Sequence, residues 1–114
     1  FKAVSIGAPV TNLVSFSGTT DIPGFIPSYF GGEYWNDLAL HMERSPIMQV
    51  AKANTPSLLQ HCEGDIRVPI GQADEFYQAL KRKGVSVRMQ AIPRQGHLPT
   101  EPKAWLRFME ANLE

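Results

Sequence analysis

The chain has 114 residues, which is enough for one domain and too few for two. Hydrophobic residues make up 43% and charged residues 19%, a balance typical of a folded globular protein. Eleven basic and eleven acidic residues cancel, so the chain lacks the basic excess that nucleic-acid binding demands. No apolar run approaches the roughly 18 residues of a membrane span, and no stretch resembles a signal peptide. We therefore expect no nucleic-acid or membrane partner and a cytoplasmic location.

The first residue is Phe1, and it opens a segment, "FKAVSIGAPV", that already has the character of a strand. Residues 3–8 are small and apolar, which predicts a strand buried on both faces. A chain that starts inside a strand leads us to expect that residues upstream have been removed or are missing. The single Cys62 excludes an internal disulfide and lacks the Cys and His companions of a zinc site, so we expect no metal and no cofactor.

Residues 9–32 are rich in Gly, Pro, Thr and Ser, which predicts an excursion with short turns rather than one regular element. Aromatic and aliphatic side chains punctuate it. They could line a pocket, or they could pin an otherwise polar loop to the core: Phe16, Phe25, Ile26, Tyr29 and Phe30.

The rest of the chain alternates between strands and helices. A short helix is predicted over residues 36–43 with Asn36 as its N-cap, and a strand over residues 57–61. Residues 71–83 have the apolar stripe of an amphipathic helix, and Gly84 suits its left-handed cap. This alternation predicts an α/β fold with a parallel sheet.

Two further elements complete the predicted fold. Residues 85–92 alternate between apolar and polar side chains, which predicts a strand near a sheet edge with one buried and one wet face. Thr100 is a candidate cap for a final helix. The apolar side of that helix is expected in the core, and it consists of Trp105, Phe108, Met109 and Leu113.

One acid and one histidine follow neighbouring strands. Asp65 lies four residues after His61, where one predicted strand ends, and His97 lies five residues after Ile92, where the next ends. Functional groups gather beyond the carboxyl ends of parallel strands, so the two loops can bring these side chains together. A carboxylate that bonds one imidazole nitrogen leaves the other free to accept a proton from a nucleophile.

Several stretches resemble one family. "HCEGDIRVP" resembles the H-G-x-x-D-x-R-V-P segment of the prolyl oligopeptidase family of serine peptidases, and "PRQGHLP" resembles its P-x-x-G-H segment. "GAPVTN", "YFGGEYW" and "RSPIMQVAKANTPSLLQH" are similar to its connecting stretches, most closely in the acylaminoacyl-peptidase and dipeptidyl-peptidase branches. The resemblance covers essentially the whole chain. It implies the C-terminal portion of a three-layer α/β-hydrolase fold, although related esterases share the Asp and His arrangement.

The resemblance also implies roles for individual residues. Asp65 would be the triad acid and His97 the general base. Arg67 would contact a backbone carbonyl of the peptide substrate, and the alternative is a salt bridge to Glu63 or Asp65. Three apolar residues could contribute to the pocket for the side chain before the scissile bond: Val68, Phe25 and Tyr29. Cys62 stands where the family usually has Gly, and we interpret it as a small buried residue rather than a nucleophile.

The serine of the triad is missing from the sequence. The α/β-hydrolase order is Ser, then Asp, then His, with the serine in a G-x-S-x-G turn. None of the seven serines has glycine at both flanking second positions. We therefore expect residues 1–114 to be a partial catalytic domain without its nucleophile turn, inactive alone, with the serine encoded before Phe1.

A truncated sheet would also expose a strand edge, which leads us to expect a homo-oligomer or a domain swap. Two other interpretations stay open. The chain could be a self-associating fragment without a catalytic role, or part of an esterase completed by a separate N-terminal half.

Overall fold

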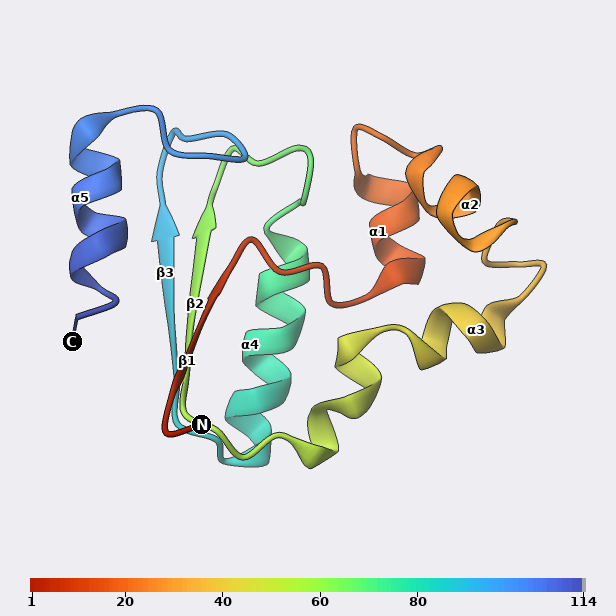
Figure 1. Ribbon diagram of the computed structural model, residues 1–114, viewed down its shortest axis with the longest axis horizontal. Helices are drawn as coiled ribbons and strands as arrows, with labels where there is room; N and C mark the ends of the chain where they lie inside the picture. The colour runs from red at the N-terminus through yellow and green to blue at the C-terminus, as the bar shows by residue number, and fades with distance from the viewer. Residues whose placement is uncertain (114) are drawn as a thin grey trace.

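Three parallel strands form the centre of the fold in the computed structural model, which describes residues 1–113 (Figure 1). They are β1 (Val4–Gly7), β2 (Ser57–Cys62) and β3 (Val87–Ile92), and they lie side by side in chain order. Because Ser57 pairs with Val4 on one side and with Val87 on the other, the strands start level, and β2 and β3 also end level, with Cys62 opposite Ile92. The predicted parallel α/β sheet is confirmed.

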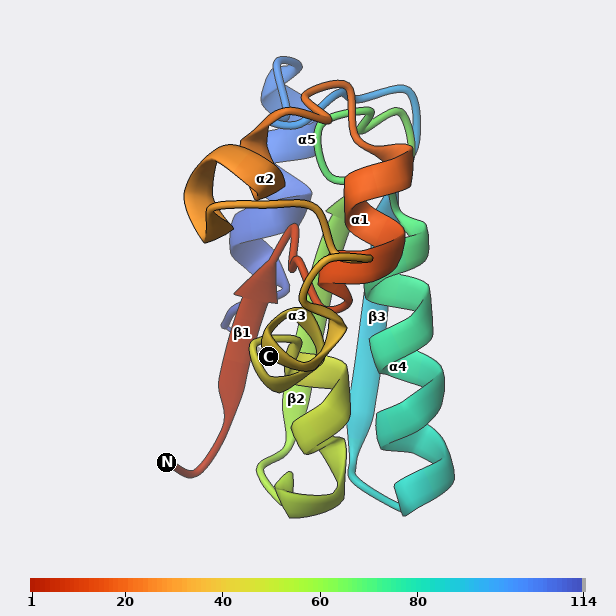
Figure 2. The same cartoon turned by 90° about the vertical axis from the view of Figure 1, so that its right-hand side faces the viewer.

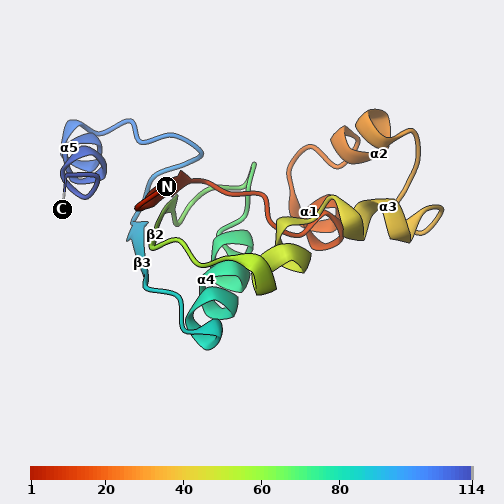
Figure 3. The ribbon, with the colours of Figure 1, turned by 60° about the horizontal axis from the view of Figure 1, so that its bottom comes forward.

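Two helices cover the two faces of this sheet and complete three layers (Figures 1 and 3). Helix α4 (Gly71–Lys83) packs on one face, where Ala73 and Leu80 form a buried cluster with Leu59 of β2. Helix α5 (Pro102–Glu110) lies on the other face. Helix α4 ends where the sequence predicts, because Gly84 takes the left-handed conformation at φ 86°.

Strand β1 is less buried than its sequence suggests. Its residues are exposed except Ile6, which is partly buried against the α4 cluster. The prediction of a strand buried on both faces is therefore wrong for the described chain. The physical reason is position, since β1 pairs with β2 on one side only and forms one edge of the sheet.

The excursion after β1 contains regular structure that the sequence did not predict. It holds α1 (Leu13–Thr19) and α2 (Phe25–Phe30), and α3 (Leu38–Glu43) and the 3-10 helix η1 (Pro46–Lys52) lead back to β2. Asn12 caps α1 by accepting from the amides of Val14 and Ser15. Asp37, not the predicted Asn36, caps α3 by accepting from the amide of Leu40 at 3.0 Å.

The apolar residues of the excursion divide into two groups. Phe16 and Ile26 are buried with Leu13 and Val68 in one cluster, so they pin the excursion to the loop after β2. Phe25 and Tyr29 on α2 are exposed and stack on each other, with ring centroids 5.8 Å apart.

Helix α5 meets the sheet through small residues rather than through the predicted stripe. Ala104 is buried against Cys62 and Ile92, and Phe108 packs partly against them. The other three members of the predicted stripe are exposed: Trp105, Met109 and Leu113. Ala104 and part of Phe108 therefore make the contact with the sheet.

Polar side chains of β2 and β3 also hold α5 against the sheet. Gln60 donates to the carbonyl of Phe108 at 2.7 Å, and Gln90 donates to that of Arg107 at 3.1 Å. The face of β3 predicted to be wet therefore bonds α5, while Ala91, predicted on the buried face, is exposed.

Thr100 does not cap α5; the helix begins after Glu101. Within residues 1–113, no helix is long and apolar enough to cross a membrane.

Candidate active site

The rim where β2 and β3 end brings Asp65 and His97 together. Nδ1 of His97 lies 2.8 Å from Oδ2 of Asp65. The carboxylate is fully buried, while 45% of the histidine side chain remains exposed. An ionised carboxylate can only accept, so Nδ1 carries the hydrogen and Nε2 of the neutral ring is left as an acceptor.

The second oxygen of Asp65 is held by its own loop. Oδ1 accepts from the backbone amides of Arg67 and Val68, each at 2.9 Å. Such a turn is typical of aspartate, whose short side chain reaches the amides two and three residues further on. Oδ1 is thus fixed within the loop, and Oδ2 is presented to the histidine.

Gly64 allows the two loops to approach. Its amide donates to the carbonyl of Gln95 at 2.9 Å, and the neighbouring amide of Glu63 donates to that of Ile92 at the same distance. A Cβ on Gly64 would lie 2.9 Å from the Gln95 oxygen, closer than real Cβ contacts. The glycine of "HCEGD" is therefore the contact point between the acid loop and the histidine loop.

Arg67 pairs with a residue that the sequence did not indicate. Its Nε donates to Oδ1 of Asp21 at 2.6 Å and its Nη2 to Oδ2 at 3.2 Å. The predicted alternative of a salt bridge to Glu63 or Asp65 thus named the wrong partner. Asp21 lies 46 residues away, just after the C-cap of α1, and no local pattern marks it.

Two more bonds fix the same contact. Thr20 Oγ1 donates to the carbonyl of Arg67 at 2.7 Å, and the amide of Asp21 donates to the carbonyl of Ile66 at 3.0 Å. The hydrogen bond from Arg67 lowers the pKa of Asp21, and the same bond raises the pKa of Arg67. Both groups are therefore charged at neutral pH.

The three predicted pocket residues lie in different surroundings. Val68 is buried in the cluster with Leu13 and Phe16, so its side chain belongs to the core. Phe25 and Tyr29 lie on α2, which in Figure 1 is beyond α1 from the sheet. The structure thus does not gather these three into one pocket beside the dyad.

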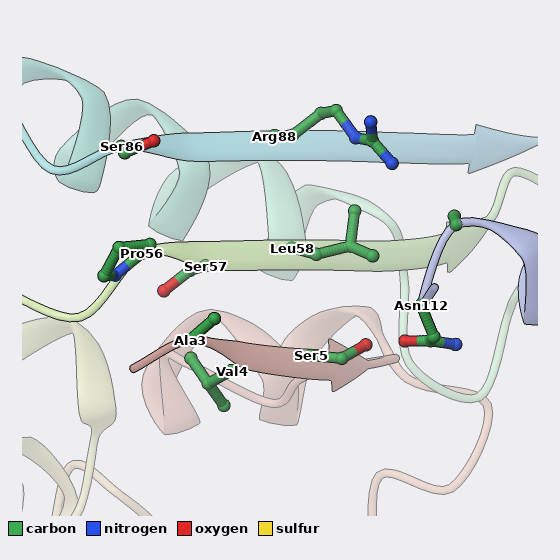
Figure 4. A pocket seen from close by; sticks show the side chains of 10 residues that line it. Ala3, Val4, Ser5, Pro56, Ser57, Leu58, Ser86, Arg88 and Asn112 are labelled. Carbon is green, nitrogen blue, oxygen red and sulfur yellow. The ribbon is translucent and has the colours of Figure 1, made fainter. Parts of the chain in front are cut away.

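A cavity of about 320 Å³ opens beside His97. It extends from the end of β1 to the start of α5, and most of its lining is apolar, including Ala8, Leu98, Trp105 and Phe108. A second hollow lies at the opposite end of the sheet, among Ala3, Ser57 and Ser86 (Figure 4). That hollow contains neither the predicted acid nor the predicted base.

Cys62 also lines the cavity but is a poor nucleophile. Burial raises the pKa of its thiol, and the nearby charge of Asp65 raises it further. The thiol is therefore neutral at neutral pH, and the thiolate is the reactive form. Among residues 1–113, no group of three or more His, Cys, Asp or Glu side chains could hold a metal ion.

A parallel sheet with a buried acid after one strand and a histidine bonded to it after the next is the arrangement of the α/β-hydrolase fold. The sequence profile of the prolyl oligopeptidase family matches residues 1–113, and the chain belongs to that family.

Curated relatives agree with this assignment. The chain is 39% identical over 100 residues to the mouse acylamino-acid-releasing enzyme, covering 82% of this chain and 14% of that enzyme. It is 33% identical over 111 residues to the Arabidopsis thaliana acylamino-acid-releasing enzyme, with 90% and 14% covered. The chain thus spans about one seventh of the length of these relatives.

Solved structures share the fold. A Mycobacterium tuberculosis puromycin-hydrolyzing peptidase matches with a TM-score of 0.91 at 25% identity, over 99% of this chain and 17% of that one. A Pyrococcus horikoshii acylaminoacyl peptidase matches with a TM-score of 0.86 at 23% identity, over 97% and 20%.

Gly64→Ala should separate the two loops. Because the added methyl group meets backbone rather than a flexible side chain, we expect a loss of about 1–3 kcal/mol in the free energy of unfolding. Gly96→Ala is the matched control, since nothing lies within 4 Å of its ideal Cβ, and it should stay within about 0.5 kcal/mol of the unmodified chain. Urea titration followed by circular dichroism measures both, and equal stabilities of the two variants would contradict the assigned contact.

Proposed function

We propose that this chain supplies the acid and the base of a serine peptidase catalytic domain, and that the nucleophilic serine comes from outside these 114 residues. The observation that carries the proposal is the buried carboxylate of Asp65 bonded to Nδ1 of His97 at 2.8 Å. The absence of a G-x-S-x-G sequence supports it. The hydrogen bonds of five serine hydroxyls support it too, because each hydroxyl donates to a group other than His97. These serines are Ser5, Ser15, Ser17, Ser45 and Ser57.

The proposed chemistry follows from the two ring nitrogens. Nε2 of His97 takes the proton of the serine hydroxyl while the serine oxygen bonds to the substrate carbonyl carbon. The imidazolium then gives that proton to the leaving amine as the C–N bond breaks, which leaves an acyl-enzyme. Water, activated by the same Nε2, hydrolyses the acyl group and restores the serine. Asp65 holds the tautomer and stabilises the imidazolium throughout.

We propose short or N-acylated peptides as substrates. The relatives are acylamino-acid-releasing enzymes, and the release of acylamino acids supports this class. Arg67 donates the Nε hydrogen and one Nη2 hydrogen to Asp21, and its other guanidinium hydrogens stay available as donors. Because the carboxylate balances its charge, the remaining donors favour a neutral acceptor, such as the backbone carbonyl of a peptide. We also propose a cytoplasmic location, with which the unpaired, buried Cys62 is compatible.

A chimera tests the proposal. The matching segment of the mouse acylamino-acid-releasing enzyme is replaced by this chain, and hydrolysis of an N-acetyl-alanine chromogenic amide is measured. We expect turnover that falls by about 10³-fold or more with His97→Ala and about 10⁴-fold with Asp65→Asn. Asp74→Asn, which alters a carboxylate in the first turn of α4, is the matched control and should leave turnover unchanged.

The chain by itself should show no turnover of this amide or of a p-nitrophenyl ester. Turnover by the chain alone that His97→Ala abolishes would overturn the proposed division of the triad. A chimera that stays fully active after His97→Ala would contradict the role of the base.

The free edge of β1 favours a second proposal, self-association. The amides of Val4 and Ala8 donate towards β2, to Pro56 and Gln60. By alternation, the amides of Ser5 and Gly7 point away from β2, where no strand of residues 1–113 pairs with them. We propose that a second copy pairs with this edge, as a homodimer or a domain swap, and this would also serve a chain without a catalytic role.

Ser5→Pro should weaken this association. Proline removes the outward amide hydrogen but leaves the inward donors of Val4 and Ala8 intact. Ser5→Ala is the control, because it loses only the hydroxyl bond to Gln60. In sedimentation velocity at micromolar concentration, we expect dimers of the unmodified and Ala chains and a shift to monomer for Pro. A monomeric unmodified chain would refute the edge as an interface.

A further inference from the structure

A second histidine lies against the acid of the dyad. His61, the penultimate residue of β2, is 1% exposed and its side chain is fully buried. Its Nε2 lies 2.7 Å from the carbonyl oxygen of Val68 and 3.4 Å from Oδ2 of Asp65. Neither the proposed chemistry nor the sequence motifs assign this ring a task.

The contacts of His61 fix its tautomer. A carbonyl oxygen has no hydrogen to give, so the short contact with Val68 requires that Nε2 carries the hydrogen. The distance to Asp65 exceeds the usual N–H···O range of about 2.7–3.2 Å and adds an electrostatic attraction to the main bond. The same hydrogen therefore faces the Val68 carbonyl first and the carboxylate second.

We propose that His61 is a positioning residue for Asp65. Its Nε2 donates a hydrogen bond to the carbonyl of Val68, and the amide of Val68 donates one to Oδ1 of Asp65 at 2.9 Å. On the other side, the positive end of the Nε2–H bond lies near Oδ2, the oxygen that His97 bonds. His61 thus holds the acid loop from inside the sheet and keeps Oδ2 turned towards the base. The inference rests on the proposed function, because it concerns the same acid and base.

The other nitrogen of the ring strengthens the argument. Nδ1 of His61 is buried and has no hydrogen-bond partner among the described residues. An apolar ring such as phenylalanine would fill similar space and would remove this buried polar atom. What histidine provides at this position, and phenylalanine cannot, is the hydrogen on Nε2.

Two substitutions separate this role from simple packing. The amide nitrogen of glutamine is as many bonds from Cβ as Nε2 of histidine, whereas that of asparagine matches Nδ1. His61→Gln therefore keeps a donor for the Val68 carbonyl, and His61→Asn does not. His61→Phe keeps the bulk and no donor.

The readout is the proton on Nδ1 of His97, followed by NMR in the full chain labelled with ¹⁵N-histidine. In the unmodified chain, its bond to Asp65 slows exchange with solvent. We expect His61→Asn and His61→Phe to speed this exchange up to about tenfold, the change that loss of a hydrogen bond allows. His61→Gln should restore a rate near that of the unmodified chain, and the amide spectrum of α4 reports that each variant is folded.

The proposal is overturned if folded Asn and Phe variants exchange this proton as slowly as the unmodified chain, or if Gln exchanges it as fast as Asn. Where a variant does not fold, the ¹⁵N shifts of His61 in the unmodified chain decide. A neutral ring with its hydrogen on Nε2 supports the proposal, and a hydrogen on Nδ1 overturns it. These measurements need no turnover, so their failure is distinct from failure of the proposed peptidase activity.

Discussion

The buried carboxylate of Asp65 is the constraint on which the site depends. A charge taken out of water destabilises a fold unless hydrogen-bond donors surround it. Here two backbone amides donate hydrogen bonds to Oδ1, and the half-exposed ring of His97 donates one to Oδ2. The need to hydrogen-bond both oxygens of the Asp65 carboxylate therefore determines the turn over residues 65–68 and the position of the loop that carries His97. The geometry expected of a catalytic pair and the geometry needed to bury an acid are the same.

The sheet makes this arrangement possible. In the side view, the loops after β2 and β3 lie together at one end of the strands, with α4 beside them (Figure 2). Parallel strands in register end at one level, so two loops that leave adjacent strands meet without a long detour. Gly64 allows these two loops to come into contact, because a side chain there would clash with the Gln95 carbonyl. The excursion adds a third support through Asp21 and Arg67.

The order of elements and the dyad could be predicted from the sequence, because both leave local signals. Helix α4 has a full apolar stripe, and Asp65 and His97 follow strands at short distances. The short helices α1 and α2 were not predicted, because the Gly, Pro, Thr and Ser residues around them are typical of turns. The face of α5 was predicted only in part: Phe108 packs on the sheet as expected, but the buried contact is Ala104, which lies outside the predicted apolar stripe. The pairing of Arg67 with Asp21 depends on tertiary structure and leaves no trace in either segment.

The central claim is that Asp65 holds the hydrogen of His97 on Nδ1 and leaves Nε2 free for a serine. The ¹⁵N shifts of the neutral His97 ring test it most directly. The account predicts the Nδ1–H tautomer in the unmodified chain and its loss in Asp65→Asn, whose amide can donate where the carboxylate only accepts. A His97 ring with its hydrogen on Nε2 in the unmodified chain would contradict the account.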